Sequence, residues 1–129
     1  MNPRDVTRFS FAARVESFRC AFRGVWTLLA SQHNAWIHLL ATALACGLGL
    51  LLGISLLEWC AIVVAIVVVW TAEALNTAFE FLCDAASPEF HPLVQKGKDS
   101  AAAAVLLSAV GAAVLGLLVF APHLLRIVR

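Results

Sequence analysis

The sequence predicts an all-α integral membrane protein, with one N-terminal amphipathic surface helix followed by three transmembrane helices. Hydrophobic residues make up 62% of the 129 residues and charged residues only 13%, whereas soluble domains are about half apolar and about a quarter charged. Three apolar stretches each reach the roughly 20 residues needed to cross a hydrocarbon core of about 30 Å. The length suits one domain, which we place at 1–129.

The N-terminal segment, 1–34, mixes arginines with large apolar residues. Its apolar residues recur at steps of three and four, the spacing of one helical face: Phe11, Val15, Phe18, Phe22, Val25 and Trp26. A basic helix with an aromatic face is typical of the membrane surface. Packing against protein is the alternative, but little soluble chain remains for such a helix to cover. We expect no cleavable signal peptide, because no early apolar region follows the first arginines.

The three membrane spans are expected at 35–57, 59–82 and 101–125. Gly53, Ile54 and Ser55 form a very short link between the first two. The second link, 85–98, is polar and contains Pro88 and Pro92. The alanines at 101–104 predict a face on which helices pack closely.

Basic residues predict the orientation of the spans in the membrane. Five arginines precede the first span, and Lys96 and Lys98 lie in the second link, on the same side of the membrane. Arg126 and Arg129 fall on the other side. The N-terminus and the second link are therefore expected in the cytoplasm.

A stripe of polar residues interrupts the second span. Glu73, Asn76, Thr77, Glu80 and Asp84 stand at i, i+3, i+4, i+7 and i+11, on one face of a helix. Hydrogen bonding between helices would explain Asn76 and Thr77 alone. Three carboxylates on one stripe repel one another unless a cation lies between them, and charges inside a span are functional or paired by default.

The depth of this stripe refines the prediction. If Trp59 marks the outer interface, Glu73 lies roughly 21 Å further along the helix and roughly 9 Å inside the opposite boundary. Glu80 then lies near that boundary and Asp84 beyond it. A water-soluble phosphate donor could meet a lipid head group there.

Lys96, Lys98 and Asp99 stand just before the third span. A helix N-terminus beside a lysine favours phosphate, although the positive-inside rule explains the lysines equally well. The chain has no Gly-x-x-x-x-Gly-Lys-Ser/Thr loop and no soluble-kinase signature, which excludes the familiar soluble nucleotide-binding folds. The net charge of +1 gives no reason to expect a nucleic-acid partner.

From Glu73 to Glu80, and at Asp84, the sequence resembles the signature of the prokaryotic diacylglycerol and undecaprenol kinases, which are small integral membrane lipid kinases. The likeness extends in matching order over nearly the whole chain, through 17–19, 21–22, Gly24, Asn34, 37–40, 88–93 and 98–106.

The resemblance implies a homotrimer in the bacterial cytoplasmic (inner) membrane that transfers the γ-phosphoryl group of ATP to a lipid hydroxyl with Mg²⁺. Glu73 matches the family's general base, and Glu80 matches its magnesium-ligating glutamate. The positions matching the ATP site are Asn76, Glu80, Glu89, His91, Lys98 and Asp99. At Gln32 many relatives carry a second metal-binding glutamate, so the composition of the metal shell stays open.

Two questions remain open at this point. Diacylglycerol and undecaprenol compete as the lipid substrate, and segments such as 37–40 and 91–93 look more like the undecaprenol branch. The competing class is a non-enzymatic three-span oligomer, such as a transporter or channel, with Glu73 as a proton or cation site. An oligomer is expected in either case, because one chain has few helices and Glu73 facing lipid would be very costly.

The remaining polar residues support simpler interpretations. His33 and His38 are five residues apart and share no helical face, so we expect no two-histidine metal site and interpret His38 as an interfacial hydrogen-bonding residue. The cysteines have no Cys-x-x-Cys spacing and are expected to be reduced packing residues: Cys20, Cys46, Cys60 and Cys83.

Overall fold

A computed structural model describes residues 10–128, and within this range every regular element is a helix. The helices are α1 (Phe11–Ser31), α2 (His33–Leu52), α3 (Leu56–Ala86) and α4 (Pro92–Val128). The all-α prediction is confirmed. The chain divides into two compact units, 1–31 and 32–129, and each is described by itself. Arg4, Arg8 and Arg129 lie outside the described residues.

The first unit is the amphipathic helix α1. Its acidic residue, Glu16, forms salt bridges with Arg19 at 3.5 Å and Arg23 at 3.1 Å. The large apolar residues of the predicted stripe, from Phe11 to Trp26, are all exposed. The structure therefore confirms the N-terminal helix, and its apolar face is free to meet a membrane surface.

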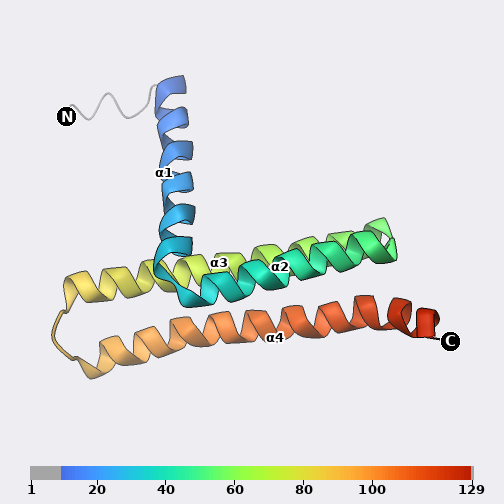
Figure 1. Ribbon diagram of the computed structural model, residues 1–129. Coiled ribbons are helices and arrows are strands. Elements are labelled where there is room, and N and C mark those ends of the chain that lie inside the picture. The colour runs from blue at the N-terminus through green and yellow to red at the C-terminus, as the bar shows by residue number, and fades with distance from the viewer. Residues whose placement is uncertain (1–9, 129) are drawn as a thin grey trace. The chain divides into compact units, whose positions relative to one another are not determined.

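The second unit consists of three long helices that run side by side in alternating directions (Figure 1). By length and composition, α2, α3 and α4 can each cross a membrane. Many of their large apolar side chains are exposed in the single chain, as expected for helices surrounded by lipid or by neighbouring copies. The predicted three-span architecture is confirmed.

The link between α2 and α3 is as short as the sequence predicts. Gly53 ends α2 in the left-handed conformation, with φ 59° and ψ 46°, which glycine adopts without steric cost. Ser55 then begins α3 with a capping box: its backbone N–H donates to Glu58 Oε2 at 2.7 Å, and its hydroxyl accepts from the Glu58 N–H at 3.4 Å. Leu56 and Leu57, assigned above to the end of the first span, therefore lie in the first turn of α3.

The apolar core of this unit lies near the same end of the bundle. Its buried residues come from the link, from α3 and from α4: Ile54, Ile62, Val119 and Phe120. Trp59 packs on this core and approaches the backbone of Gly49 so closely that a Cβ there would lie 2.8 Å from the indole ring. The absent side chain at Gly49 is what lets α2 and α3 approach here.

The link between α3 and α4 is much shorter than the expected 85–98, because α4 already begins at Pro92. Proline is favoured at the first helical position, where its missing N–H removes no helical hydrogen bond. His91 Nδ1 accepts the N–H of Leu93 at 3.2 Å, as an N-cap side chain does. Lys96, Lys98 and Asp99 therefore lie in the first turns of a helix.

Candidate active site

The polar stripe of α3 faces the interior of the second unit at the end away from the Trp59 core. Glu73 is 0% exposed, and Asn76 and Thr77 are also buried. Thr77 Oγ1 donates to the Glu73 carbonyl at 2.9 Å, which satisfies this hydroxyl inside the bundle. Glu80, one turn further on, is half-buried, and Asp84 is exposed. The stripe therefore runs from a buried carboxylate towards an accessible one.

Two side-chain amides hold the Glu80 carboxylate. Asn76 Nδ2 donates to Glu80 Oε1 at 3.3 Å. Gln32 Nε2, from the residue just before α2, donates to Glu80 Oε2 at 3.2 Å. Each carboxylate oxygen thus accepts one neutral donor and keeps lone-pair capacity for a further ligand.

The Glu73 carboxylate, by contrast, has no hydrogen-bond partner on either oxygen. The nearest ionisable group is His38 of α2, whose Nε2 lies 3.7 Å from Glu73 Oε2. That distance is too long for a hydrogen bond, and the two groups would form an ion pair only with a protonated imidazole. His38 Nε2 and Asn76 Oδ1 are also buried without a partner. Such unsatisfied polar atoms are rare in native interiors and call for an explanation.

These side chains share one cavity of about 270 Å³ between α2, α3 and α4. Its lining unites four of the residues singled out from the sequence: Gln32, Glu73, Asn76 and Glu80. It also includes Asn34 and His38, to which the sequence analysis assigned no site role. An ionisable residue within a span is a functional candidate by default, so the position of His38 in an apolar stretch was a usable signal.

The other predicted site residues do not line this cavity. Lys98 Nζ donates to Asp84 Oδ1 at 2.9 Å. Gln95 Nε2 donates to Asp99 Oδ1 at 2.8 Å. Glu89 and His91 are exposed in and beside the α3–α4 link. The predicted site residues outside the cavity all lie beyond Glu80, towards the polar end of the stripe: Lys98, Asp99, Glu89 and His91.

The donor set around Glu80 fits Mg²⁺ better than it fits a metal that needs a dedicated protein cage. Among residues 10–128 no three His, Cys, Asp or Glu side chains cluster as a cage would require. Mg²⁺ is commonly held by one or two carboxylates together with substrate phosphates and water. Glu80 would supply one carboxylate. Gln32 would add a carbonyl oxygen if its amide turned by half a rotation, since its nitrogen now faces Glu80.

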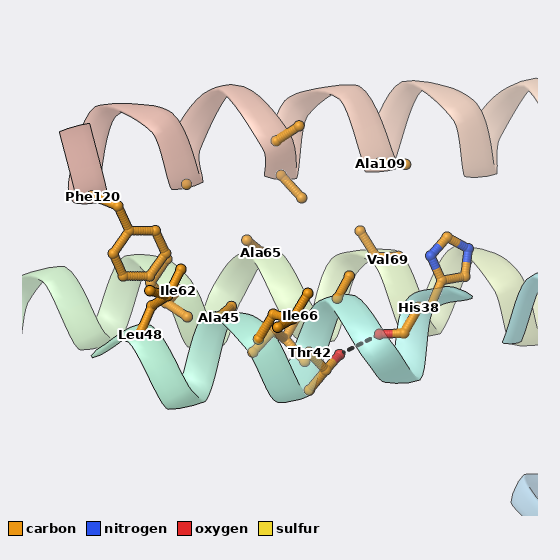
Figure 2. Close-up of a pocket in the computed structure, with 15 residues that line it drawn as sticks. His38, Thr42, Ala45, Leu48, Ile62, Ala65, Ile66, Val69, Ala109 and Phe120 are labelled. Atoms are coloured by element: carbon orange, nitrogen blue, oxygen red, sulfur yellow. Dashed lines mark hydrogen bonds between the residues drawn. The ribbon is translucent and has the colours of Figure 1, made fainter. Parts of the chain in front are cut away.

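A second, apolar cavity of about 360 Å³ adjoins the first. Figure 2 shows His38 at one end of it and Phe120 at the other, with α4 facing α2 and α3 across it. Small or aliphatic residues form most of its walls. Thr42 and His38 are its polar members, and the Thr42 hydroxyl is engaged, donating to the His38 carbonyl at 2.7 Å and accepting from Trp70 Nε1 at 3.0 Å. His38 and Ala109 line both cavities.

Comparison with known proteins identifies the family that the chain resembles. Residues 19–120 match the prokaryotic diacylglycerol kinase family. The chain is 37% identical over 109 residues to the undecaprenol kinase of Bacillus subtilis, covering 84% of this chain and 89% of that protein. It is also 37% identical over 117 residues to a diacylglycerol kinase of Synechocystis sp., covering 86% of this chain but only 64% of that longer protein. No solved structure matches the chain.

The family match covers α2, α3 with its polar stripe, and α4 as far as Phe120. The matches also decide between the two function classes left open by the sequence, in favour of an enzyme. The chain belongs to the prokaryotic diacylglycerol kinase family and is a bacterial membrane lipid kinase.

Proposed function

We propose that this protein transfers the γ-phosphoryl group of ATP, with Mg²⁺, to the hydroxyl group of a membrane lipid. The observation that carries the proposal is the buried, unpartnered Glu73 carboxylate at one cavity with Glu80. The lipid oxygen bonds to the γ-phosphorus, the bond from that phosphorus to the bridging oxygen breaks, and ADP leaves with the electron pair. Glu73 accepts the hydroxyl proton.

Phosphoryl transfer needs positioned reactants, a metal to spread charge and a group to receive the proton. The two glutamates divide these tasks, because they stand seven residues apart, about 10 Å along α3. Glu73 has no bonds to lose and is free to receive a proton. Glu80, fixed by two amides and closer to the polar end, would hold Mg²⁺ with Gln32.

The nucleotide is expected on the polar side of Glu80. Asn76 lines the cavity, and Lys98, Asp99, Glu89 and His91 are gathered near the start of α4. For Lys98 to meet a phosphate it would exchange its bond to Asp84 for one to the nucleotide. The lysine would then be paired with an anion both before and after the exchange.

Undecaprenol is the substrate that the apolar cavity favours over diacylglycerol. A prenol is hydrocarbon up to its hydroxyl carbon, whereas diacylglycerol carries two ester groups beside the hydroxyl. The cavity wall next to His38 offers Thr42 as a polar side chain, and its hydroxyl is already engaged. The other polar side chain, His38, has one unpartnered nitrogen, which cannot serve two ester carbonyls and the hydroxyl at once, and burying ester carbonyls without donors is costly. The match over 89% of the B. subtilis undecaprenol kinase agrees with this choice.

Placement and assembly are also part of the proposal: the cytoplasmic (inner) membrane, a cytoplasmic N-terminus and a homotrimer. The single chain already buries Glu73 completely, so that side chain does not by itself require neighbouring copies. The family resemblance favours the trimer, and the exposed apolar faces of α2–α4 leave surface for neighbouring copies as well as for lipid. Native mass spectrometry of active protein in mild detergent tests this, and a fully active monomer would contradict it.

The enzymatic proposal is tested with purified protein in lipid nanodiscs, labelled ATP, Mg²⁺ and either undecaprenol or diacylglycerol. We expect labelled lipid phosphate to form faster with undecaprenol than with diacylglycerol, and on the order of 10²–10⁴-fold more slowly with Glu73→Gln than with the wild type. Higher kcat/KM for diacylglycerol would overturn the substrate choice. Absence of product from both lipids would overturn these two acceptors.

A further inference from the structure

The strongest unexplained feature of the site is a pair of facing, unsatisfied groups on two helices. His38 Nε2 on α2 and Glu73 Oε2 on α3 lie 3.7 Å apart, and both are buried without a hydrogen-bond partner. The His38 side chain is only 12% exposed and that of Glu73 1%. Leaving a buried donor and a buried acceptor without hydrogen-bond partners costs free energy. Here both groups line the same cavity.

The two atoms are close enough for one oxygen atom beside them to bond to both. An oxygen placed about 2.8 Å from each would lie roughly 2 Å off the 3.7 Å line that joins them. A hydroxyl there can use both partners at once, because it is a donor and an acceptor. It would donate its proton to Glu73 and accept the N–H of His38.

The surroundings fix the His38 ring for such a contact. The ring meets the edge of Trp70 at a centroid distance of 6.4 Å and an interplanar angle of 68°. The Trp70 indole is in turn hydrogen-bonded to Thr42 Oγ1, which bonds the backbone of His38 itself. This closed set of contacts between α2 and α3 limits rotation of the ring, as precise positioning of a reactant requires.

The two cavities meet at this histidine. On one side lies the polar cavity with Glu73 and Glu80, and on the other the apolar cavity that runs to Phe120 (Figure 2). A lipid alcohol with its chain in the apolar cavity would present its terminal oxygen at His38.

We propose that His38 binds the substrate hydroxyl together with Glu73, so that the two side chains clamp the lipid oxygen where the cavities meet. The proposal rests on the function proposed above and adds a substrate-contacting residue to it. Glu73 receives the proton of the hydroxyl, while the Nε2–H of His38 holds its oxygen in place for attack on phosphorus.

Three variants test the clamp by steady-state kinetics. His38→Leu removes the donor, and His38→Gln keeps an N–H near the position of Nε2. His33→Gln is the matched control, because His33 is an exposed histidine of the same helix. We expect kcat/KM for the lipid to fall on the order of 10-fold in His38→Leu, to recover largely in His38→Gln and to stay unchanged in His33→Gln. The KM for MgATP should stay constant in all three.

A pair of inhibitors separates contact with the substrate from a structural role. The methyl ether of the alcohol that the wild type phosphorylates can accept from His38 but has no proton to transfer, and the matching hydrocarbon lacks the oxygen. The ether should inhibit wild type and His38→Gln on the order of 10-fold better than the hydrocarbon. In His38→Leu the two should inhibit equally.

A preference for the ether that survives in His38→Leu would overturn the proposal, as would the absence of any preference in the wild type. Equal loss of activity in His38→Leu and His38→Gln would also overturn it. If His38→Leu does not fold, His38→Met replaces it in the same comparison. Failure of the wild type to phosphorylate any lipid alcohol would instead refute the proposed function, so the two failures are distinguishable.

Discussion

The opposed environments of Glu73 and Glu80 allow their roles to be separated by one conservative substitution at each site. Glu73→Gln keeps the shape of the side chain and removes the proton acceptor. Loss of a general base typically costs 10²–10⁴-fold in turnover, which is about 3–5 kcal/mol of activation free energy. Because neither Glu73 oxygen has a hydrogen-bond partner, the substitution breaks no bond, and thermal stability should not fall.

Glu80→Gln should give the opposite pattern. The carboxylate accepts one amide on each oxygen, and glutamine retains a single carbonyl oxygen. One of the two amides therefore loses its acceptor, at a cost of about 1.5–3 kcal/mol for a bond to a charged group. Mg²⁺ would also lose a charged ligand, so the concentration of Mg²⁺ for half-maximal activity should rise, and excess Mg²⁺ should restore part of the rate.

The assay combines turnover, MgATP affinity and thermal unfolding followed by circular dichroism, for wild type and both variants in one detergent. Our assignment predicts low turnover with normal affinity and stability for Glu73→Gln. It predicts a higher Mg²⁺ concentration for half-maximal activity and a lower melting temperature for Glu80→Gln. If Glu73→Gln lost nucleotide binding while Glu80→Gln lost only turnover, the two roles would be reversed.

Three further predictions follow from the sequence and the structure. Gln32→Glu adds a second carboxylate beside Glu80 and should lower the Mg²⁺ concentration for half-maximal activity; an unchanged Mg²⁺ titration would place Gln32 outside the metal shell. Gly49→Ala puts a Cβ 2.8 Å from the Trp59 ring and should destabilise the protein by about 1–3 kcal/mol in thermal unfolding. Gly47→Ala is the matched control, because a Cβ at that position meets open space, and it should not destabilise the protein. Reporter fusions should place the N-terminus in the cytoplasm and the C-terminus outside, and a cytoplasmic C-terminus would rule out this orientation.

The local features of the fold were predictable because they depend on neighbouring residues. Hydropathy over about 20 residues identified three spans, and the three- and four-residue spacing of apolar residues identified α1. The early start of α4 was also encoded locally, by Pro92 at the first helical position and His91 as its cap. The expected link, 85–98, was too long, because its polar residues from Pro92 onwards belong to α4.

Within the site, the sequence by itself determined which residues share one face of α3, because the helical period alone places Glu73, Asn76 and Glu80 together. Tertiary structure decided which residues of other helices meet that face. It brought Gln32 to Glu80 and His38 to Glu73, and it left Lys98 and Asp99 outside the cavity. Helical period is a property of one segment, whereas the register between helices depends on packing contacts such as Gly49 against Trp59, which join residues distant in the chain.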